Sequence, residues 1–295
     1  MGNGFDLDLG LKTSYADFAK SPEWNNLMEG NDNSKDKSRL LGFLKSKYEV
    51  EKWIDIEAAL LEFASKKTST RDFAHAKEDN EAYIALCRAL KDYLLGQQST
   101  FTKTKNSVAY SLLSVISRLS NQSCLYSFNY TQVDVLASKC NIPMGFDATH
   151  IHGSLAENGD IILGIETMDP IDERYAFLYK TQSRHYKHTN IIRDLNNKDE
   201  YVFFGHSLNG MDFAYFNSIF SLLANSSLSL PHITIITKDV NAENQFKNFL
   251  RKEYISLQAL YSNTDPVFIL TDEIYRNNQE EKNKVYYLLN RARTF

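Results

Sequence analysis

The chain opens on two glycines that flank an asparagine, Gly2-Asn3-Gly4, followed by Phe5 and Asp6. Glycines let backbone N–H groups approach a phosphate, and an acidic side chain just beyond them can bond a ribose hydroxyl. The pattern therefore predicts a nucleotide-binding loop. The alternative is a plain turn in which Asp6 caps a helix. A Gly-x-Gly by itself is weak evidence, so the prediction depends on the residues that accompany it.

Two further polar turns follow predicted strands. Asn129 and Tyr130 end the segment SCLYSFNY, where an amide can orient a ribose or a water. The alternative is an Asx-turn that leads into the next helix. His152, which is followed by Gly153 and Ser154, is the predicted general base, because an unperturbed imidazole titrates near neutral pH.

A His-x-His pair raises a second chemistry. His150 and His152 are two residues apart, so on a strand both side chains face the same way. Such a pair can bind a metal, with His206, Asp212 or Asp6 as further ligands. Nothing in the spacing requires a metal, and a histidine bonded to the backbone is the commoner case. We expect no metal.

The segment GHSLNGMD follows the most apolar predicted strand. Gly205 frees the turn, His206 and Ser207 follow it, and the Ser207 hydroxyl can bond a phosphate or ribose. Ser207 or Asn209 can cap the next helix, and Asp212 lies in its first turn, where an acidic residue is stabilising. Because the segment lacks the second glycine of G-x-S-x-G, it does not predict a serine hydrolase.

Other polar residues have sufficient structural explanations. Thr13 or Ser14 can cap the helix that begins at YADF, with Asp17 at capping-box distance from Ser14, and a ligand contact by Thr13 is the minor alternative. Asp55 and Glu57 lie two residues apart near the start of an amphipathic helix, so they do not share a helix face. Acidic residues at that end complement the helix dipole.

The elements that must position these residues change character along the chain. Helical spacing of apolar residues predicts helices at 38–48, 53–67, 80–95 and 108–120, with a polar loop at 29–38. After Ser123, short strands predicted at 123–130, 148–154, 160–166, 200–207, 232–237 and 266–270 alternate with helices at 132–140, 174–195, 209–225, 241–254 and 276–295. Such alternation predicts a parallel sheet with helices on both faces.

The predicted fold is therefore α/β: a Rossmann-like, doubly wound parallel sheet with a large helical insertion after the first glycine loop. We expect a single domain over 1–295, in which 1–20 form the glycine loop and first helix, 21–120 the insertion and 121–295 the rest of the core. In such sheets a strand precedes the glycine loop, and none precedes Gly2 here. We expect a misassigned start, with the first strand missing from this chain; the alternative is that the loop binds no nucleotide.

A missing central strand has structural consequences. It leaves backbone N–H and C=O groups unpaired and removes buried apolar side chains. We therefore expect the numbered chain to be less stable than a form extended by an apolar segment. We also expect Met1 to lie inside the sheet region, with Gly2 to Asp6 near Asn129, His152 and Ser207.

Composition sets the class of protein. The 295 residues are 43% hydrophobic and 24% charged, with a net charge of −4, which is typical of a globular domain without a global basic field for nucleic acid. The three cysteines, Cys87, Cys124 and Cys140, are far apart and odd in number, which fits a reducing cytoplasm. No apolar run reaches the roughly 18 residues of a membrane span. The basic run at 184–188 is interpreted as a solvated helix face, with a substrate or RNA contact as the alternative.

Several segments together resemble the AbiH family of bacteriophage abortive-infection proteins. They are GNGFDLDLGLKTSYADF, WIDIE, FNYT, HIHGSL with ILGIE, and FFGHSLNGMDFAYF, and their order and spacing extend across nearly the whole chain. Members of that family usually carry an apolar strand before GNGFD. The W-x-D-x-E pattern makes Glu57 a secondary site candidate.

A looser resemblance is to sirtuin-like NAD-binding domains, whose glycine loop, asparagine turn, His-Gly pair and Gly-x-Ser loop occur in the same order. The counterparts are Gly2-Asn3-Gly4, Asn129, His152-Gly153 and Gly205-His206-Ser207. Thr131 stands where an acidic residue is expected, and the four-cysteine zinc module is absent, which argues against protein deacetylation. The resemblance implies NAD as ligand or substrate, with hydrolysis of its nicotinamide–ribose bond.

These observations lead to three hypotheses. In the first, a cytoplasmic antiphage protein hydrolyses NAD, with His152 as base and Asn129 orienting the ribose or water. In the second, the protein is a nucleotide-binding sensor or scaffold without catalysis, which the Thr131 departure favours. In the third, His150 and His152 belong to a metal-dependent hydrolase or nuclease. A phage-derived trigger and a homo-oligomer are further partners we consider; a membrane partner is not expected.

Overall fold

The computed structural model describes residues 1–34, 37–52, 55–65, 75–103, 107–117, 123–145, 147–166, 170–186, 191–195, 198–208, 210–225, 231–264 and 266–291. Of the residues and predicted segments discussed above, 35–36, 53–54, 66–67, 118–120, 187–190, 209 and 292–295 lie outside the described residues. Along the described part, no helix is both long and apolar enough to cross a membrane.

The described strands form two small sheets with parallel pairing. β3 (Glu200–Phe204), β4 (His232–Thr237) and β5 (Val267–Leu270) form one sheet in that order. In its register, Phe203 pairs with Ile235, which pairs with Phe268. β1 (Tyr126–Ser127) and β2 (Thr149–His150) form the second sheet. The runs YVFF and ITII are thus strands of a parallel sheet, and the α/β class with parallel strands is confirmed.

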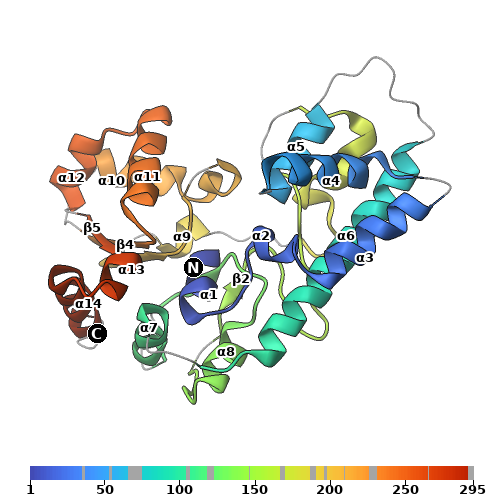
Figure 1. Cartoon of the computed structure of the whole chain (residues 1–295). Helices are drawn as coiled ribbons and strands as arrows, with labels where there is room; N and C mark the ends of the chain where they lie inside the picture. The colour runs from blue at the N-terminus through green and yellow to red at the C-terminus, as the bar shows by residue number, and fades with distance from the viewer. Residues whose placement is uncertain are drawn as a thin grey trace.

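Residues 1 and 2 connect the two sheets. The Met1 amino group donates to the Tyr126 carbonyl (2.6 Å), and the Phe128 N–H donates to the Met1 carbonyl (2.9 Å). On the other side, the Gly2 N–H donates to the Phe204 carbonyl (2.8 Å). The chain start therefore lies beside β1 and β3, as predicted for Met1. Figure 1 shows the N-terminus and α1 in this central place.

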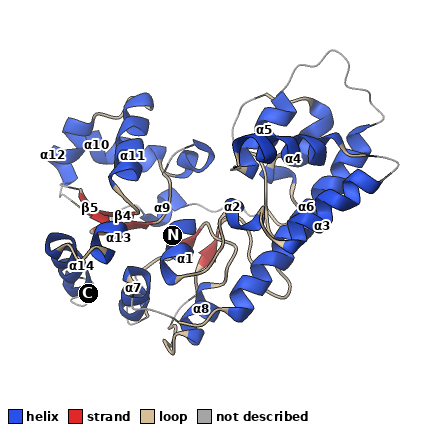
Figure 2. Ribbon diagram, viewed as in Figure 1, coloured by secondary structure: helices blue, strands red, loops and turns tan. Residues whose placement is uncertain are grey.

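The β3–β4–β5 sheet carries helices between and after its strands (Figure 2). They are α10 (Asn217–Asn225), α11 (Val240–Lys252), α12 (Leu257–Thr264), α13 (Thr271–Tyr275) and α14 (Gln279–Arg291). Phe203, Ile235 and Phe268 of the strands share one apolar cluster with Phe220 and Leu250 of the helices. The sequence prediction missed α12 and α13, because both are too short for a clear helical period.

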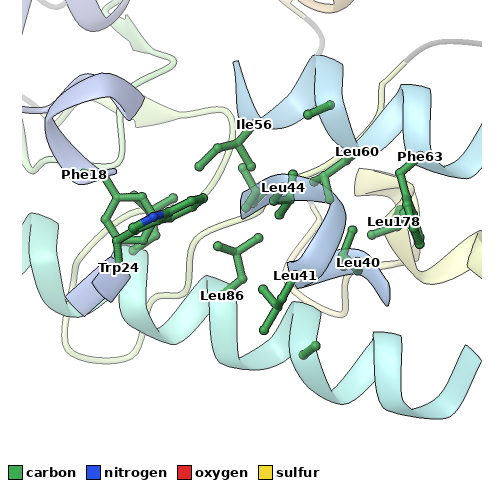
Figure 3. Packing of buried hydrophobic residues seen from close by; sticks show 14 of the residues in the cluster. Phe18, Trp24, Leu40, Leu41, Leu44, Ile56, Leu60, Phe63, Leu86 and Leu178 are labelled. Atoms are coloured by element: carbon green, nitrogen blue, oxygen red, sulfur yellow. The ribbon is translucent and has the colours of Figure 1, made fainter. Parts of the chain in front are cut away.

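A second apolar cluster forms the helical region on the other side of the N-terminus. Its helices are α2 (Tyr15–Phe18), α3 (Pro22–Asn33), α4 (Arg39–Glu51), α5 (Ile56–Ser65) and α6 (His75–Thr100). Ser14, Ser21 and Ser38 cap α2, α3 and α4 by accepting a backbone N–H at the third helical position, so the cap predicted at Ser14 is confirmed. Leu44, Ile56 and the other residues labelled in Figure 3 fill the space between these helices.

The third apolar cluster lies beneath the chain start. It joins α1 (Asn3–Leu9), α7 (Val108–Ile116) and α8 (Val133–Lys139) to β3 and β4. Phe5 packs edge-to-face on Phe204, with ring centroids 5.3 Å apart. The buried Asp8 carboxylate accepts the Ala109 N–H at 2.8 Å and the Tyr275 hydroxyl.

Three predicted elements were wrong. Residues 174–195 are not one helix but two short 3₁₀ segments, η1 (Glu173–Leu178) and η2 (Lys180–Gln182), and later α9 (Ile191–Leu195). Tyr179 is extended (φ −71°, ψ 130°) and bridges to Ile165, which interrupts the helix. Residues 160–166 form isolated bridges rather than a strand. The predicted loop at 29–38 begins inside α3, which ends at Asn33.

Candidate functional site

A cavity of about 300 Å³ opens where β1 and β3 end. The turn after β1 contributes Asn129 and Tyr130, and the turn after β3 contributes Gly205 and Ser207. The carboxyl ends of parallel strands are where α/β sheets bind ligands. The size is at the lower end of the range for small-molecule pockets, roughly 300–1,000 Å³.

Most of the predicted site residues line this cavity. They are Gly2, Asn3, Asp6, Asn129, Tyr130, His152, Gly205, His206, Ser207 and Asp212. Four predicted residues do not line it. Gly4 packs on Gly205, Phe5 is buried in the third apolar cluster, and Gly153 and Ser154 follow the cavity wall into the turn that faces Asp160.

Close backbone packing explains the glycines of the opening loop. A Cβ on Gly4 would lie 2.6 Å from the Gly205 Cα, and one on Gly2 would lie 2.7 Å from the His206 Cα. Gly205 itself has φ +59°, and its Cβ would lie 2.4 Å from the Gly4 Cα. The Gly4 N–H donates to the Gly205 carbonyl (2.9 Å), and the Gly2 N–H to that of Phe204. Both amides are thus bonded within the protein, and the contact between the two turns is what requires glycine here.

Asp6 ties the first helix to the asparagine turn. Its carboxylate accepts the Asn129 amide at 2.8 Å and the Thr131 hydroxyl at 2.7 Å, and the side chain is 1% exposed. Burial raises the pKa of Asp6 to about 6, although both hydrogen bonds act in the other direction. Thr131, which departs from the sirtuin-like pattern, therefore has a partner in Asp6. The second N–H of the Asn129 side-chain amide donates to the Gly2 carbonyl (3.0 Å). Oδ1 is therefore the remaining polar atom of this side chain.

Behind the cavity wall, Lys180 is the centre of a buried charged cluster. Its Nζ lies 3.0 Å from Glu57 Oε1, 3.6 Å from Asp212 Oδ1 and 3.3 Å from both ring nitrogens of His152. The lysine side chain is fully buried. These carboxylates outweigh the effect of burial, so the pKa of Lys180 is raised and the ammonium stays charged. Glu57 Oε1 and one ring nitrogen of the neutral His152 can accept its protons, while Asp212 is an ion-pair partner at longer range.

His152 differs from the prediction of an ordinary imidazole. Burial, with Lys180 second, lowers the pKa of His152 to about 3, so the ring is neutral at pH 7 and is a weak base. Its Nε2 lies 3.4 Å from Asp212 Oδ1. His206 accepts the Leu208 N–H on Nδ1 (2.9 Å), which assigns its ring proton to Nε2, 3.5 Å from Asp212 Oδ2.

The pKa values of the two carboxyl groups in the cluster, Asp212 and Glu57, are shifted in opposite directions. Burial acts to raise the pKa of Asp212, but His152, Lys180 and His206 outweigh it and the pKa lies well below its usual range. Burial raises the pKa of Glu57 well above its usual range, despite the opposing effect of Lys180. A pair of acids with separated pKa values is typical of acid–base sites. Glu57 is therefore the carboxyl that titrates nearest neutrality.

The cavity lining is acidic. Asp6, Asp55, Glu57 and Asp212 all reach it, whereas none of the described lining residues is lysine or arginine. Leu90, Leu94, Phe128 and the ring of Tyr130 supply its apolar surface. An acidic and partly aromatic cavity is suited to a cationic, planar group more than to a phosphate.

His150 lies apart from this cluster. Its Nδ1 is 3.0 Å from the Asn129 carbonyl oxygen, and it does not line the cavity. This is the backbone-bonded alternative considered for the pair. Within the described ranges, no group of three His, Cys, Asp or Glu side chains could hold a metal ion.

Sequence reasoning did not single out Lys180 and treated Glu57 only as a secondary candidate. Lys180 stands in the segment 174–195, which is predicted as a helix, and a lysine in a helix is usually on the solvated face. Glu57 has its helix-dipole explanation, and its partner is far away in the chain. Glu166, which accepts the Tyr215 hydroxyl at 3.0 Å beside the same cluster, was also missed. The only available signal for Glu57 was the W-x-D-x-E resemblance.

Fold and site together define an α/β protein with parallel strands and an acidic cavity at their carboxyl ends. The family model described as bacteriophage abortive infection AbiH matches residues 1–231. The chain belongs to the AbiH family, and that family implies a function in phage abortive infection. No curated protein and no solved structure matches the chain.

Proposed function

We propose that this protein is a cytoplasmic antiphage enzyme with a Rossmann-like, sirtuin-related core that binds NAD and hydrolyses its nicotinamide–ribose bond. The observation that carries the proposal is the convergence of the asparagine turn, His152 and the Gly-His-Ser turn on one cavity, at the carboxyl ends of β1 and β3. The sirtuin-like motif order suggests NAD as the ligand.

The charge of the cavity suggests which half of NAD enters it. The nicotinamide ring is a pyridinium cation, and breaking its bond to ribose leaves an oxocarbenium-like centre. The ionised Asp212 and the neighbouring Glu57 supply negative charge near such a group, which is electrostatic stabilisation of the transition state. The diphosphate would then lie toward the rim, near the exposed Ser207.

The neutral side chains of the cavity orient the reacting groups. Asn129 has only Oδ1 left for a ribose hydroxyl or the attacking water, because Gly2 and Asp6 bind its amide hydrogens. His152 offers a neutral imidazole, which Lys180 and Asp212 hold in place. Fixing ribose and water in this way lowers the entropic part of the barrier.

The test is incubation of the purified full chain with NAD, with ADP-ribose and nicotinamide quantified by chromatography. We expect hydrolysis by the wild type, alone or after phage challenge of cells that express it. We expect at least a tenfold loss in His152→Ala and in Asn129→Ala. His232→Ala, an exposed histidine on β4, is the matched control. Absence of ADP-ribose above the His152→Ala background would refute the enzymatic proposal.

One observation favours the alternative of a nucleotide-binding sensor without turnover. The ring of His152 has a pKa of about 3, so it is a poor base at neutral pH. This alternative predicts calorimetric binding of NAD that persists in His152→Ala, with no product formed by the wild type under any condition tested.

A further inference from the structure

Glu57 is held at the cavity by contacts from two other segments. Its Oε1 accepts the Lys180 ammonium at 3.0 Å and the Gly164 N–H at 3.4 Å. The side chain is 18% exposed and lines the cavity. Because both contacts use Oε1, the second carboxylate oxygen has no partner among the described residues. One oxygen is thus anchored and the other is available to a molecule in the cavity.

Helix α5 fixes the backbone from which Glu57 projects. Ile56 and Leu60, on either side of it in the helix, are fully buried in the apolar cluster of Figure 3. Leu178, two residues before Lys180, is buried in the same cluster. The cluster therefore sets the positions of both members of the ion pair.

Building on the proposed function, we propose that Glu57 is the general base of NAD hydrolysis and that Lys180 is the residue that positions it. The free oxygen of Glu57 takes a proton from water as the water oxygen bonds to the ribose carbon. The bond from that carbon to the pyridinium nitrogen breaks, and its electron pair neutralises the nicotinamide. The products are nicotinamide, ADP-ribose and the proton on Glu57, which is released to solvent.

The other carboxylates of the cavity are committed elsewhere. Asp6 accepts hydrogen bonds from Asn129 and Thr131, one on each oxygen. Asp55 accepts the Ala58 N–H at the start of α5 with Oδ1, and among the described residues no cation positions its other oxygen. Asp212 lies between His152 and His206 and is a weak base, because its pKa is well below the usual range. Glu57 combines an available oxygen with basicity.

The groups that face Glu57 determine its titration. They are Lys180, Asp212 and Asp55, together with the phenols of Tyr15, Tyr83 and Tyr130, which stay protonated because burial raises their pKa values. Burial and the two acids raise the pKa of Glu57, and the Lys180 ammonium lowers it. Removing that ammonium should therefore move the titration of Glu57 to higher pH.

The first experiment compares Glu57→Gln with Glu62→Gln, the same change on the outer side of the same helix. Glu57→Gln should reduce kcat for NAD at least about 100-fold, the usual contribution of a general base, with the calorimetric Kd for NAD within about threefold of wild type. Glu62→Gln should stay within about twofold. Glu57→Asp, which withdraws the carboxylate by one methylene, should also reduce kcat.

The second experiment tests Lys180 by a readout that a structural role would not move. In Lys180→Met the acidic limb of the kcat/KM–pH profile should shift upward by about one unit or more, whereas Lys180→Arg should keep the limb near its wild-type place. A wild type that hydrolyses NAD while Glu57→Gln retains more than a tenth of kcat overturns the inference and leaves the proposed function standing. A wild type that forms no product overturns both.

Discussion

Helix α5 faces two different environments. Ile56 and Leu60 lie in an apolar cluster with no exposed surface, while Glu57 reaches a cavity lined by carboxylates. The same contrast occurs across the site, where Leu178 enters the apolar cluster and Lys180 joins Glu57. The apolar side chains fix short backbone segments in place. The charged side chains on the same segments are thereby held in fixed positions. Buried charges are costly, so a well-packed neighbouring cluster is what keeps them in one arrangement.

The largest expected loss of stability comes from disrupting the backbone contact between Gly4 and Gly205 at the cavity. Gly205→Ala places a Cβ 2.4 Å from Gly4 atoms at a residue with φ +59°. Because backbone would have to move on both sides, we expect a loss of about 4 kcal/mol in unfolding free energy, the upper range for one substitution. Urea denaturation measures it.

Gly96→Ala is the matched control for this substitution. Gly96 lies within α6, and a Cβ there meets nothing within 4 Å. Alanine in a helix interior should raise the unfolding free energy by about 0.5–1 kcal/mol. A Gly205→Ala protein as stable as wild type would show that the two turns do not pack as described.

The next largest loss of stability is expected from truncating a side chain of the apolar cluster that packs against α5. Leu60→Ala removes a fully buried side chain from the cluster that holds α5, so we expect a loss of about 3 kcal/mol. Leu222→Ala, on a leucine that is 55% exposed on α10, should change stability by less than about 0.5 kcal/mol. Equal losses in the two variants, measured by urea denaturation, would contradict the assignment of Leu60 to the core.

A smaller loss of stability is expected from His152, at the cavity, as pH falls. The pKa of His152 is lowered from 6.5 to about 3. Its contribution to stability is therefore fully present above pH 6.5 and is lost progressively as pH falls toward 3, because the folded protein resists protonation of the ring. Between pH 7 and pH 4.5, the wild type should lose about 2.5 kcal/mol more than His152→Gln.

The control for this pH effect is His232→Gln, on an exposed histidine of β4. It should follow the wild type across the same pH range in urea denaturation. If His152→Gln also follows the wild type, the His152 ring is not buried beside Lys180.

The sequence predicted the parts of the fold that have strong local patterns. Continuous apolar runs indicated β3, β4 and β5, and the order of polar turns indicated that Gly2, Asn129, His152 and Ser207 would meet. Both signals depend on neighbouring residues or on a rule of parallel sheets, that the turns after their strands share one edge.

The rest of the site depends on pairing that one sequence does not display. Lys180 has the appearance of a surface lysine until the extended Tyr179 turns the segment and brings it to Glu57. The low pKa of His152 arises from burial and from the same lysine. A wrong helix prediction at 174–195 thus hid the lysine, and Glu57 already had a sufficient explanation in the helix dipole.

The smallest expected effect is the stability change of Glu57→Gln, and it sharpens the comparison within α5. Glutamine keeps an oxygen to accept the Lys180 ammonium and the Gly164 N–H, and Lys180 retains the Asp212 carboxylate at 3.6 Å. The change also removes the cost of keeping a carboxylate charged in a buried place beside Asp212; burial first, and then Asp212, raise the pKa of Glu57. Since the lost attraction and the relieved cost oppose each other, the unfolding free energy at pH 7 should change by less than about 1 kcal/mol. A measured loss above about 2 kcal/mol in urea denaturation would show that Glu57, like Leu60, mainly stabilises the fold.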